Sequence, residues 1–527
     1  MEPKTIDKKE IIKSFLEKGI LLSPDMLQTD TELDNIQKNI TEKIHSKDFL
    51  ILNKDICCLL ESKPCLDTNW CELERAKAIL EKGKSDKAYK QFLGYLNTEK
   101  KQEDIKLENK AVKIVSSYKA ESKKRDIQDF VQHFNARYRA LEKLLRNRQE
   151  LNTILSINRI IHKTDRGHIS LIGTVQNKQT TKNNNIMLTL EDPTGTIKVL
   201  ANKNKPELYE IAKDIVLDEV IAVVGANGDN IVFANNILQP DAPQKDLKKS
   251  PHEGCVAVLS DLHVGSNNFL AEDFDRFIEW INQRKGNEVQ INLAKSIQYI
   301  LIVGDLIDGC GIYPEQDKEL TIKDITEQYA ECARLLKQIP PHINIIICPG
   351  NHDAMRIAEP QPPLYEDFAG AIHEMPNVTL VSNPATINIH GTEEFSGFEV
   401  LMYHGYSFDF FVANVDSIRN NGGYDRGDLI MKFLLKKRHL APTHTSTLYM
   451  PHSEKDPLVI EKIPDLFVTG HIHKSIVANY KNTTMVSGSC WQSKTSFQER
   501  VGHNPEPSRV PIINLKTRDV KILKFGK

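Results

Sequence analysis

The stretch Cys255-Val256-Ala257-Val258-Leu259-Ser260-Asp261-Leu262-His263 decides how the C-terminal half of this chain folds. It opens with an apolar, partly β-branched run, which is typical of a strand buried on both faces of a sheet. An Asp and a His follow at the point where the strand ends, which is where open α/β sheets place their sites. Taken alone, Asp261 and His263 would more often be hydrogen-bonded structural residues than ligands.

The same arrangement recurs further along the chain. The apolar run 299–303 leads into Gly304-Asp305-Leu306-Ile307-Asp308, and the run 343–347 leads into Gly350-Asn351-His352-Asp353. His404-Gly405 and Gly470-His471-Ile472-His473 add imidazoles. The five motifs together supply carboxylates, imidazoles and one amide oxygen, which are the ligand types that two adjacent divalent ions require. The joint pattern therefore predicts a two-metal site at the ends of buried strands.

The order of these motifs resembles that of the calcineurin-like metallophosphoesterase superfamily over residues 253–527. Further stretches at 437–442 (Lys-Arg-His-Leu-Ala-Pro), 491–498 (Trp-Gln-Ser-Lys-Thr-Ser-Phe-Gln) and 509–515 (Arg-Val-Pro-Ile-Ile-Asn-Leu) are similar to the small subunit of the archaeal family D DNA polymerase (DNA polymerase II). That family carries an oligonucleotide-binding barrel ahead of its phosphoesterase domain. We therefore expect an α+β multidomain protein with a small helical N-terminal domain, an oligonucleotide-binding β-barrel and an α/β, β-sandwich metallophosphoesterase domain.

Composition and periodicity divide the chain into four parts. Residues 1–75 show helical spacing of apolar residues, and this domain either docks a partner or packs on the rest of the chain. Residues 76–125 are rich in Lys and Glu and poor in apolar residues, which predicts a charged flexible linker. Residues 126–245 combine an amphipathic helix with five short strands, and one helix lies between the third and fourth strands, as in an oligonucleotide-binding barrel. Residues 250–527 form the phosphoesterase (exonuclease) domain, which closes with a hairpin over 511–525.

Three features each allow two interpretations. The basic residues of the amphipathic helix, among them Arg137, contact DNA or, more commonly, form a solvated face. The barrel, with Lys178 and Lys205 near its loops, holds a single strand or contacts another subunit, and we favour the contact. The aromatic segment 406–411 stacks on splayed bases or packs in the core, and packing is the more common role.

The resemblance also assigns the metal ligands. A phosphodiester resists hydrolysis because its charge repels hydroxide and its leaving alkoxide is poor, and two ions about 3.5–4 Å apart answer both problems. By the family's pattern, one ion takes Asp261, His263, Asp305 and His473, and the other takes Asp305, Asn351, His404 and His471. Mixed nitrogen and oxygen ligands suit Mn²⁺, Zn²⁺ or Fe²⁺ better than Mg²⁺, and the family's nucleases point to Mn²⁺.

Two further residues receive catalytic roles from the resemblance. His352 would protonate the leaving oxygen as a general acid. Asp308 is the family's candidate to orient that imidazole, and a hydrogen bond from Asp308 to the loop backbone is an equal alternative. Gly309 stands where phosphomonoesterase relatives commonly have Arg, which argues against small phosphomonoester substrates.

The resemblance implies a Mn²⁺-dependent 3′→5′ exonuclease that acts on single-stranded DNA or on a mispaired primer–template 3′ end. It would be the proofreading subunit of a replicative archaeal heterodimer whose large catalytic subunit performs polymerisation. A non-catalytic accessory or scaffold subunit is the first rival, and the filled ligand positions disfavour it. A stand-alone phosphatase or cyclic-nucleotide phosphodiesterase is the second, and the preceding barrel and the missing Arg disfavour it.

Length, charge and hydropathy constrain the number of domains, the kind of DNA contact and the cellular location. The chain has 527 residues, enough for two to four domains. A net charge of −2 means that DNA contact must come from local patches rather than from the whole molecule. No apolar run approaches the ~18 residues of a membrane span, and Met-Glu-Pro-Lys lacks the pattern of a signal peptide. We therefore expect a cytoplasmic protein without membrane contact.

Overall fold

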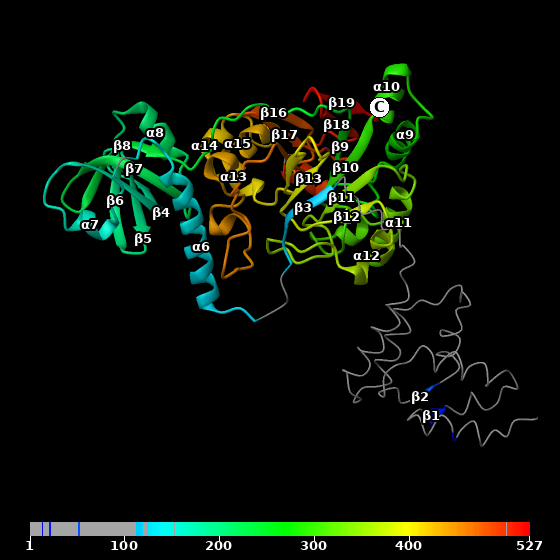
Figure 1. Cartoon of the computed structure of the whole chain (residues 1–527), viewed down its shortest axis with the longest axis horizontal. Helices are drawn as coiled ribbons and strands as arrows, with labels where there is room; N and C mark the ends of the chain where they lie inside the picture. The colour runs from blue at the N-terminus through cyan, green and yellow to red at the C-terminus, as the bar shows by residue number, and fades with distance from the viewer. Residues whose placement is uncertain are drawn as a thin grey trace, which may run out of the picture. The chain divides into compact units, whose positions relative to one another are not determined.

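The computed structural model describes residues 13, 21–22, 51–52, 112–119, 124–151, 153–501 and 503–526 (Figure 1). The chain divides into two compact units, 1–106 and 107–527. In the first unit, β1 (Leu21–Leu22) and β2 (Ile51–Leu52) pair in parallel. The rest of the predicted helical domain 1–75, and residues 76–111 and 120–123 of the predicted linker, lie outside the described residues. No helix in the described ranges is long and apolar enough to cross a membrane.

A six-stranded sheet carries the three apolar runs predicted as buried strands. Its order is β12-β11-β10-β9-β18-β19, with parallel pairing from β12 to β9 and antiparallel pairing of β18 with both neighbours. The strands are β9 (Cys255–Leu259), β10 (Ile297–Val303), β11 (Asn344–Cys348), β12 (Val378–Leu380), β18 (Arg509–Asn514) and β19 (Val520–Lys524). The three predicted strands are β9, β10 and β11, and the predicted closing hairpin is β18–β19.

A second six-stranded sheet, of order β16-β17-β15-β14-β13-β3, packs on the first. Its strands are β3 (Val112–Ser117), β13 (Ala385–Ile389), β14 (Phe398–Met402), β15 (Leu466–Thr469), β16 (Ile476–Tyr480) and β17 (Thr483–Ser487). Side chains from both sheets, such as Val258 and Leu301 from the first and Val400 and Val468 from the second, form one fully buried core. The two sheets are therefore the inner layers of a sandwich.

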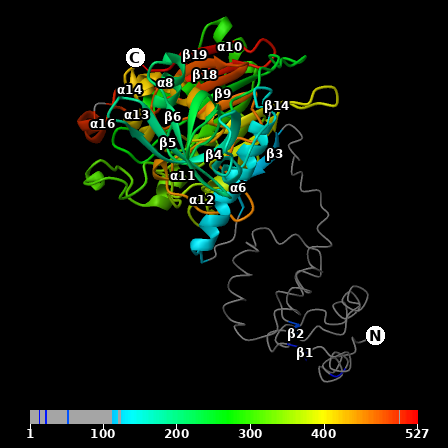
Figure 2. The same cartoon turned by 90° about the vertical axis from the view of Figure 1, so that its left-hand side faces the viewer.

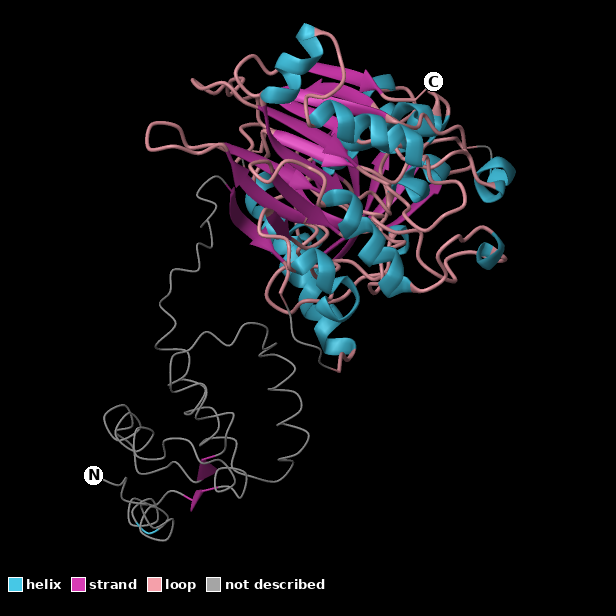
Figure 3. Cartoon of the chain, turned by 90° about the vertical axis from the view of Figure 1, so that its right-hand side faces the viewer, coloured by secondary structure: helices cyan, strands magenta, loops and turns pink. Residues whose placement is uncertain are grey.

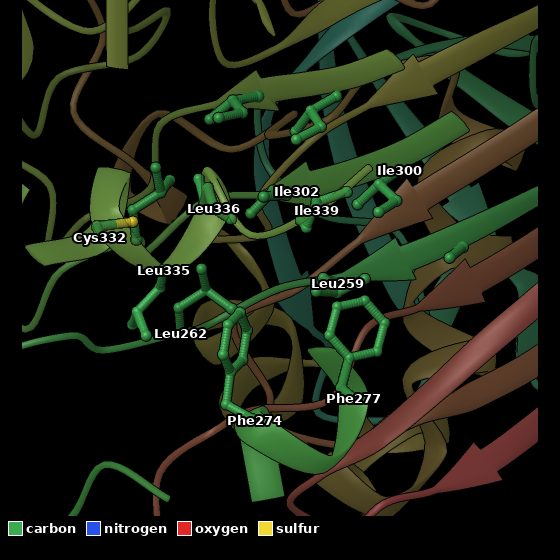
Figure 4. Close-up of a cluster of buried hydrophobic side chains, with 14 of the residues drawn as sticks. Leu259, Leu262, Phe274, Phe277, Ile300, Ile302, Cys332, Leu335, Leu336 and Ile339 are labelled. Carbon is green, nitrogen blue, oxygen red and sulfur yellow. The ribbon is translucent and has the colours of Figure 1, made fainter. Parts of the chain in front are cut away.

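Helices cover the outer faces of the sandwich (Figure 3). On the first sheet lie α9 (Ala271–Ile281), α10 (Glu288–Lys295), α11 (Ile325–Leu336) and α12 (Glu366–His373). Figure 4 shows Phe274 and Phe277 of α9 and Leu336 of α11 around Leu259 and Ile302 of the sheet. On the second sheet lie α13 (Phe408–Asn414), α14 (Asp416–Arg419) and α15 (Gly427–Lys437). The predicted α/β architecture with packed sheets is thus present.

The prediction of a flexible linker over 76–125 is wrong for residues 112–117, because these residues form strand β3 at the edge of the second sheet. It pairs antiparallel with β13, and beyond it the Tyr118 amide donates to Ser382 Oγ at 2.7 Å. Most of its side chains are exposed. Main-chain pairing rather than apolar burial therefore stabilises this strand, which explains why its charge-rich surroundings gave no strand signal.

The predicted barrel is confirmed (Figure 2). Helix α6 (Ile127–Arg146) and the short α7 (Ile157–Ile161) precede it. The closed barrel has the order β4-β5-β6-β8-β7. Its elements are β4 (His168–Thr180), β5 (Ile186–Asp192), β6 (Gly195–Ala201), α8 (Pro206–Lys213), β7 (Val220–Asn227) and β8 (Ile231–Leu238). The single helix between the third and fourth strands and the alternation of buried side chains along β5 and β6 match the expectation.

Buried ion pairs join the barrel segment to the sandwich, and they overturn the interpretation of Arg137. Arg137 is 1% exposed, and its Nε lies 2.6 Å from Asp456 Oδ2. It therefore neither faces solvent nor is available to DNA. Lys437 of α15 pairs in the same way with Glu219, the residue before β7, at 2.6 Å.

The lysines near the barrel loops are also partly committed. Lys178 Nζ donates to the Ile215 carbonyl at 2.9 Å, and Lys205 Nζ donates to Asn235 Oδ1 at 2.7 Å. Both ammonium groups therefore donate hydrogen bonds to other residues of the barrel segment.

Candidate metal centre

The predicted ligands meet because each follows the carboxyl end of a strand. Asp261 and His263 follow β9, Asp305 follows β10, and Asn351 follows β11. In the second sheet, His404 follows β14, and His471 and His473 follow β15. The ligand residues of both sheets therefore reach one place at the edge of the sandwich.

Asp261, His263 and His473 form a first ligand group, in which all three residues are buried. His473 Nε2 lies 3.3 Å from Asp261 Oδ1 and 3.1 Å from His263 Nε2. Two imidazole nitrogens facing each other at this distance beside a buried carboxylate suit a shared cation.

Asp305, His404 and His471 form a second ligand group, whose donor atoms all lie within 4.8 Å of one another. His404 Nε2 lies 3.2 Å from Asp305 Oδ2 and 3.1 Å from Asn351 Oδ1. The predicted amide ligand thus joins this group. The two groups bring the predicted ligand residues together, with Asp305 in the second group, whereas the prediction assigns it to both ions.

The imidazoles are oriented by bonds on the side away from the site. His404 Nδ1 lies 2.8 Å from the Val303 carbonyl, which requires a proton on Nδ1. His263 Nδ1 lies 3.1 Å from Asp308 Oδ1, and His473 Nδ1 lies 2.9 Å from the Gln498 amide. In His404 and His263, Nδ1 faces an acceptor oxygen, as in metal-bound histidines, whereas Nδ1 of His473 accepts from the Gln498 side-chain amide. In all three rings Nε2 is the atom that faces the ligand groups.

His471 has the opposite arrangement. Its Nε2 lies 3.0 Å from Asp409 Oδ2, so Nδ1 remains free for the second ligand group. Asp409 was not among the predicted site residues. The signal for it was a single carboxylate inside the aromatic segment 406–411, directly after His404-Gly405. In that segment Phe408 and Phe411 are fully buried, so packing is confirmed for both rings.

Asp308 and His352 are neighbours, but not through the contact that was expected. The Asp308 carboxylate faces His263 Nδ1 and accepts hydrogen bonds from the amides of Gln316 and Gln492, each at 2.9 Å. His352 Nδ1 instead lies 2.8 Å from the main-chain carbonyl of Asp308. The His352 ring stands edge-on to His263, with centroids 4.7 Å apart.

The backbone at the ligand groups is strained. Five ligand residues have left-handed φ angles between 52° and 70°: Asp261, His263, Asp305, His471 and His473. This conformation costs an L-residue roughly 1–2 kcal/mol. Such strain persists where the surroundings over-determine it, and it concentrates at functional sites. Packing around Gly304 adds to the constraint, because a Cβ there would overlap the His404 imidazole.

The charges of the two groups depend on one another. Burial raises the pKa of Asp305, but the imidazoles of His404 and His352 outweigh burial and hold that pKa well below its usual range. Burial lowers the pKa of His404, yet Asp305 outweighs it and raises the pKa to about 10. Among the described residues, the ion-pair partners of Asp261 and Asp305 are imidazoles rather than Lys or Arg. Buried carboxylates whose charge is balanced only by potential ligands fit a site for divalent cations.

Asp353 holds the turns under the site together. Its carboxylate accepts from the amides of Asp305 at 2.9 Å and Gly350 at 2.8 Å, and from the Tyr329 hydroxyl at 3.1 Å. Burial and the nearby Asp305 raise the pKa of Asp353 to about 7. We assign it to the support of the loops rather than to the ligand groups.

Comparison with known proteins identifies the family. Residues 256–477 match the B-subunit family of DNA polymerases alpha and epsilon, and residues 169–226 match the OB-fold nucleic acid binding domain. The DNA polymerase II small subunit of Methanothermobacter thermautotrophicus is 38% identical over 76% of this chain and 80% of its own length. The small subunit of Archaeoglobus fulgidus is 34% identical over 81% of this chain and 84% of its own length. The small subunit of Methanocaldococcus jannaschii is 38% identical over 74% of this chain and 64% of its own length. The chain therefore belongs to the family of archaeal DNA polymerase II small subunits.

Proposed function

We propose that this chain is a two-metal phosphodiester hydrolase that removes nucleotides from DNA 3′ ends within a polymerase assembly. Family membership supports the polymerase role. The observation that carries the nuclease role is the meeting of the two ligand groups, with Asn351 beside the second, on strained backbone at strand ends. We further propose a heterodimer with a large catalytic subunit that performs polymerisation.

The two ligand groups would hold two divalent ions, with Mn²⁺ as the proposed species. Such ions would offset the negative charge of the phosphate and lower the pKa of the attacking water. On the family's pattern we assign Asp305 to both ions; its Oδ2 faces His404 of the second group, and its Oδ1 accepts the His352 amide at 2.7 Å. That bond to the main chain keeps His352 beside the ligands.

His352 is the proposed general acid. Because its Nδ1 is held by the Asp308 carbonyl, Nε2 is the atom free to carry a proton to the substrate. Water attacks the phosphorus and releases one proton to solvent, the bond from phosphorus to O3′ breaks, and Nε2–H protonates the departing O3′; solvent then reprotonates Nε2. Burial lowers the pKa of His352 despite the attraction of Asp305. Because Nδ1–H is bonded to the Asp308 carbonyl, the general-acid role requires the imidazolium form, in which Nε2 also carries a proton. The products are a 5′-nucleotide and a DNA strand with a new 3′-hydroxyl.

The barrel and its helix have a separate proposed role as a subunit contact. Arg137 and Lys437 tie this segment to the sandwich through buried ion pairs, so the barrel is attached to the domain that holds the site. A partner bound to the barrel would therefore be carried at a defined position relative to the ligand groups. An accessory subunit without catalysis is the alternative, and the experiment below separates the two.

The test is Mn²⁺-dependent digestion of a primer–template with a mismatched 3′ end and a 5′ label, by the full chain alone and with the large subunit. We expect a ladder that shortens from the 3′ end, that EDTA abolishes, and that Asp305→Asn and His352→Ala lose. The exposed residues Asp275 and His342 provide the matched controls Asp275→Asn and His342→Ala, which should retain the ladder. An undigested primer in every condition would contradict the nuclease and favour the accessory subunit.

A further inference from the structure

Asp409 lies beside the second ligand group and is not accounted for by the predicted ligands. It sits in the first turn of α13, and its Oδ2 lies 3.0 Å from His471 Nε2. Its other carboxylate oxygen accepts the Tyr424 hydroxyl at 2.9 Å. Both oxygens are therefore engaged, one by the imidazole and one by a donor that holds the carboxylate in place.

Core packing determines where this carboxylate stands. Phe408 and Phe411, on either side of Asp409 in α13, are both 0% exposed and anchor the helix in the core over the second sheet. Asp409 itself is partly exposed, so its side chain projects from an anchored helix toward the site. Tyr424 belongs to the short helix η3 (Gly423–Arg426), so a separate segment supports the second oxygen.

A carboxylate on the far nitrogen of a ligand imidazole fixes both its tautomer and its ring orientation. At His471 it requires a proton on Nε2 and leaves the Nδ1 lone pair to the second ligand group. Without that partner, His471 can rotate or place its proton on Nδ1, and either change removes a ligand.

We propose that Asp409 is a positioning residue that holds His471 as an Nδ1 ligand of the second ion, with Tyr424 as its support. The inference rests on the proposed two-metal function and deepens it. It also predicts an asymmetry, because the first group is oriented by other residues, namely Asp308 at His263 and Gln498 at His473. Loss of Asp409 should therefore weaken one ion and spare the other.

The experiment is a titration of the metal-free full chain with Mn²⁺, followed by isothermal calorimetry and by the electron paramagnetic resonance of free Mn²⁺. We expect two ions per parent chain. Asp409→Asn and Asp409→Ala should bind the first ion normally and the second roughly 10–100-fold more weakly, and Tyr424→Phe should give a smaller loss in the same direction. Asp416→Asn is the matched control, because Asp416 is an exposed carboxylate on the next helix that pairs with Arg419. It should bind both ions as the parent does.

The outcomes separate this inference from the function on which it rests. Two ions bound with parental affinity by Asp409→Asn would overturn the positioning role and leave the two-metal site intact. A parent chain that takes up no Mn²⁺ would overturn both. A merely structural role would lower the thermal unfolding temperature of the metal-free variant, which we expect to stay at the parental value. A fall in that temperature with Mn²⁺ affinity unchanged would also refute the proposal.

Discussion

Replacement of Arg137 by Met should destabilise the chain strongly, because it isolates a buried carboxylate. Arg137 and Asp456 are 1% and 3% exposed, and the 2.6 Å ion pair joins helix α6 to the segment after α15. Removing one partner of a buried pair costs about 3–5 kcal/mol. Three contacts to Asp456 survive in the variant: His439 at 2.8 Å, His133 at 3.4 Å and the Leu458 amide at 2.9 Å. These place the expected loss toward ~3 kcal/mol.

The guanidinium also has contacts that Met cannot replace. Its Nη1 donates to the Pro442 carbonyl at 2.8 Å, and it lies 4.9 Å from the ring centroids of both Phe134 and Tyr449. Cation–π contacts of buried groups add on the order of 1–2 kcal/mol. Methionine would keep part of the packing volume, so the variant tests the charge rather than the cavity.

Urea unfolding of the full chain, followed by circular dichroism, measures this effect. Arg139→Met is the matched control, because Arg139 lies on the same helix and is exposed, and its change should stay within about 0.5 kcal/mol. Asp456→Asn should also destabilise, and the double variant should lose less than the sum of the two single variants. A loss below 1 kcal/mol for Arg137→Met, or strict additivity with Asp456→Asn, would refute the assignment of this pair as an energetic link.

Three further predictions concern the site and the same buried cluster. Gly304→Ala should abolish Mn²⁺ uptake, because its Cβ would overlap the His404 ring, whereas Gly370→Ala, with open space around its Cβ, should bind Mn²⁺ normally in the same calorimetric assay. His352→Ala should lower kcat on the mismatched primer by about 10²–10⁴-fold with both ions still bound, and an unchanged kcat would reject the general acid. Burial lowers the folded pKa of His439 to about 4, so its stability contribution is complete above an unfolded pKa of about 6.5 and is lost as pH falls from there toward 4. His439→Gln should flatten the dependence of urea midpoints on pH across that window, and an unchanged slope would contradict it.

The first sheet, the barrel and the position of the ligand residues at strand ends followed from local sequence patterns. Runs such as 255–259 are apolar throughout and partly β-branched, so burial on both faces can be predicted from consecutive residues. The ligands follow such runs directly, and parallel strands bring their carboxyl ends to one edge whatever the distance between them in the chain. The division of these residues between two ions, with Asp261 beside His473 and Asp305 beside His404, came from the resemblance of the motif order to a known family and not from these local patterns.

Partners distant in the chain decided what the sequence could not show. Arg137 has the helical spacing and charge of a solvated residue, and only Asp456, 319 positions away, makes its burial tolerable. Asp409 lies 62 positions from His471 and is anchored by two phenylalanines of its own helix. Strand β3 forms because its main chain pairs with that of β13 at the edge of the second sheet. Sequence periodicity indicates which face of a helix or strand is buried against apolar residues. It does not indicate which distant residue pairs with a charged side chain or with a main-chain amide. For Arg137, Asp409 and strand β3 only the tertiary structure determines that partner.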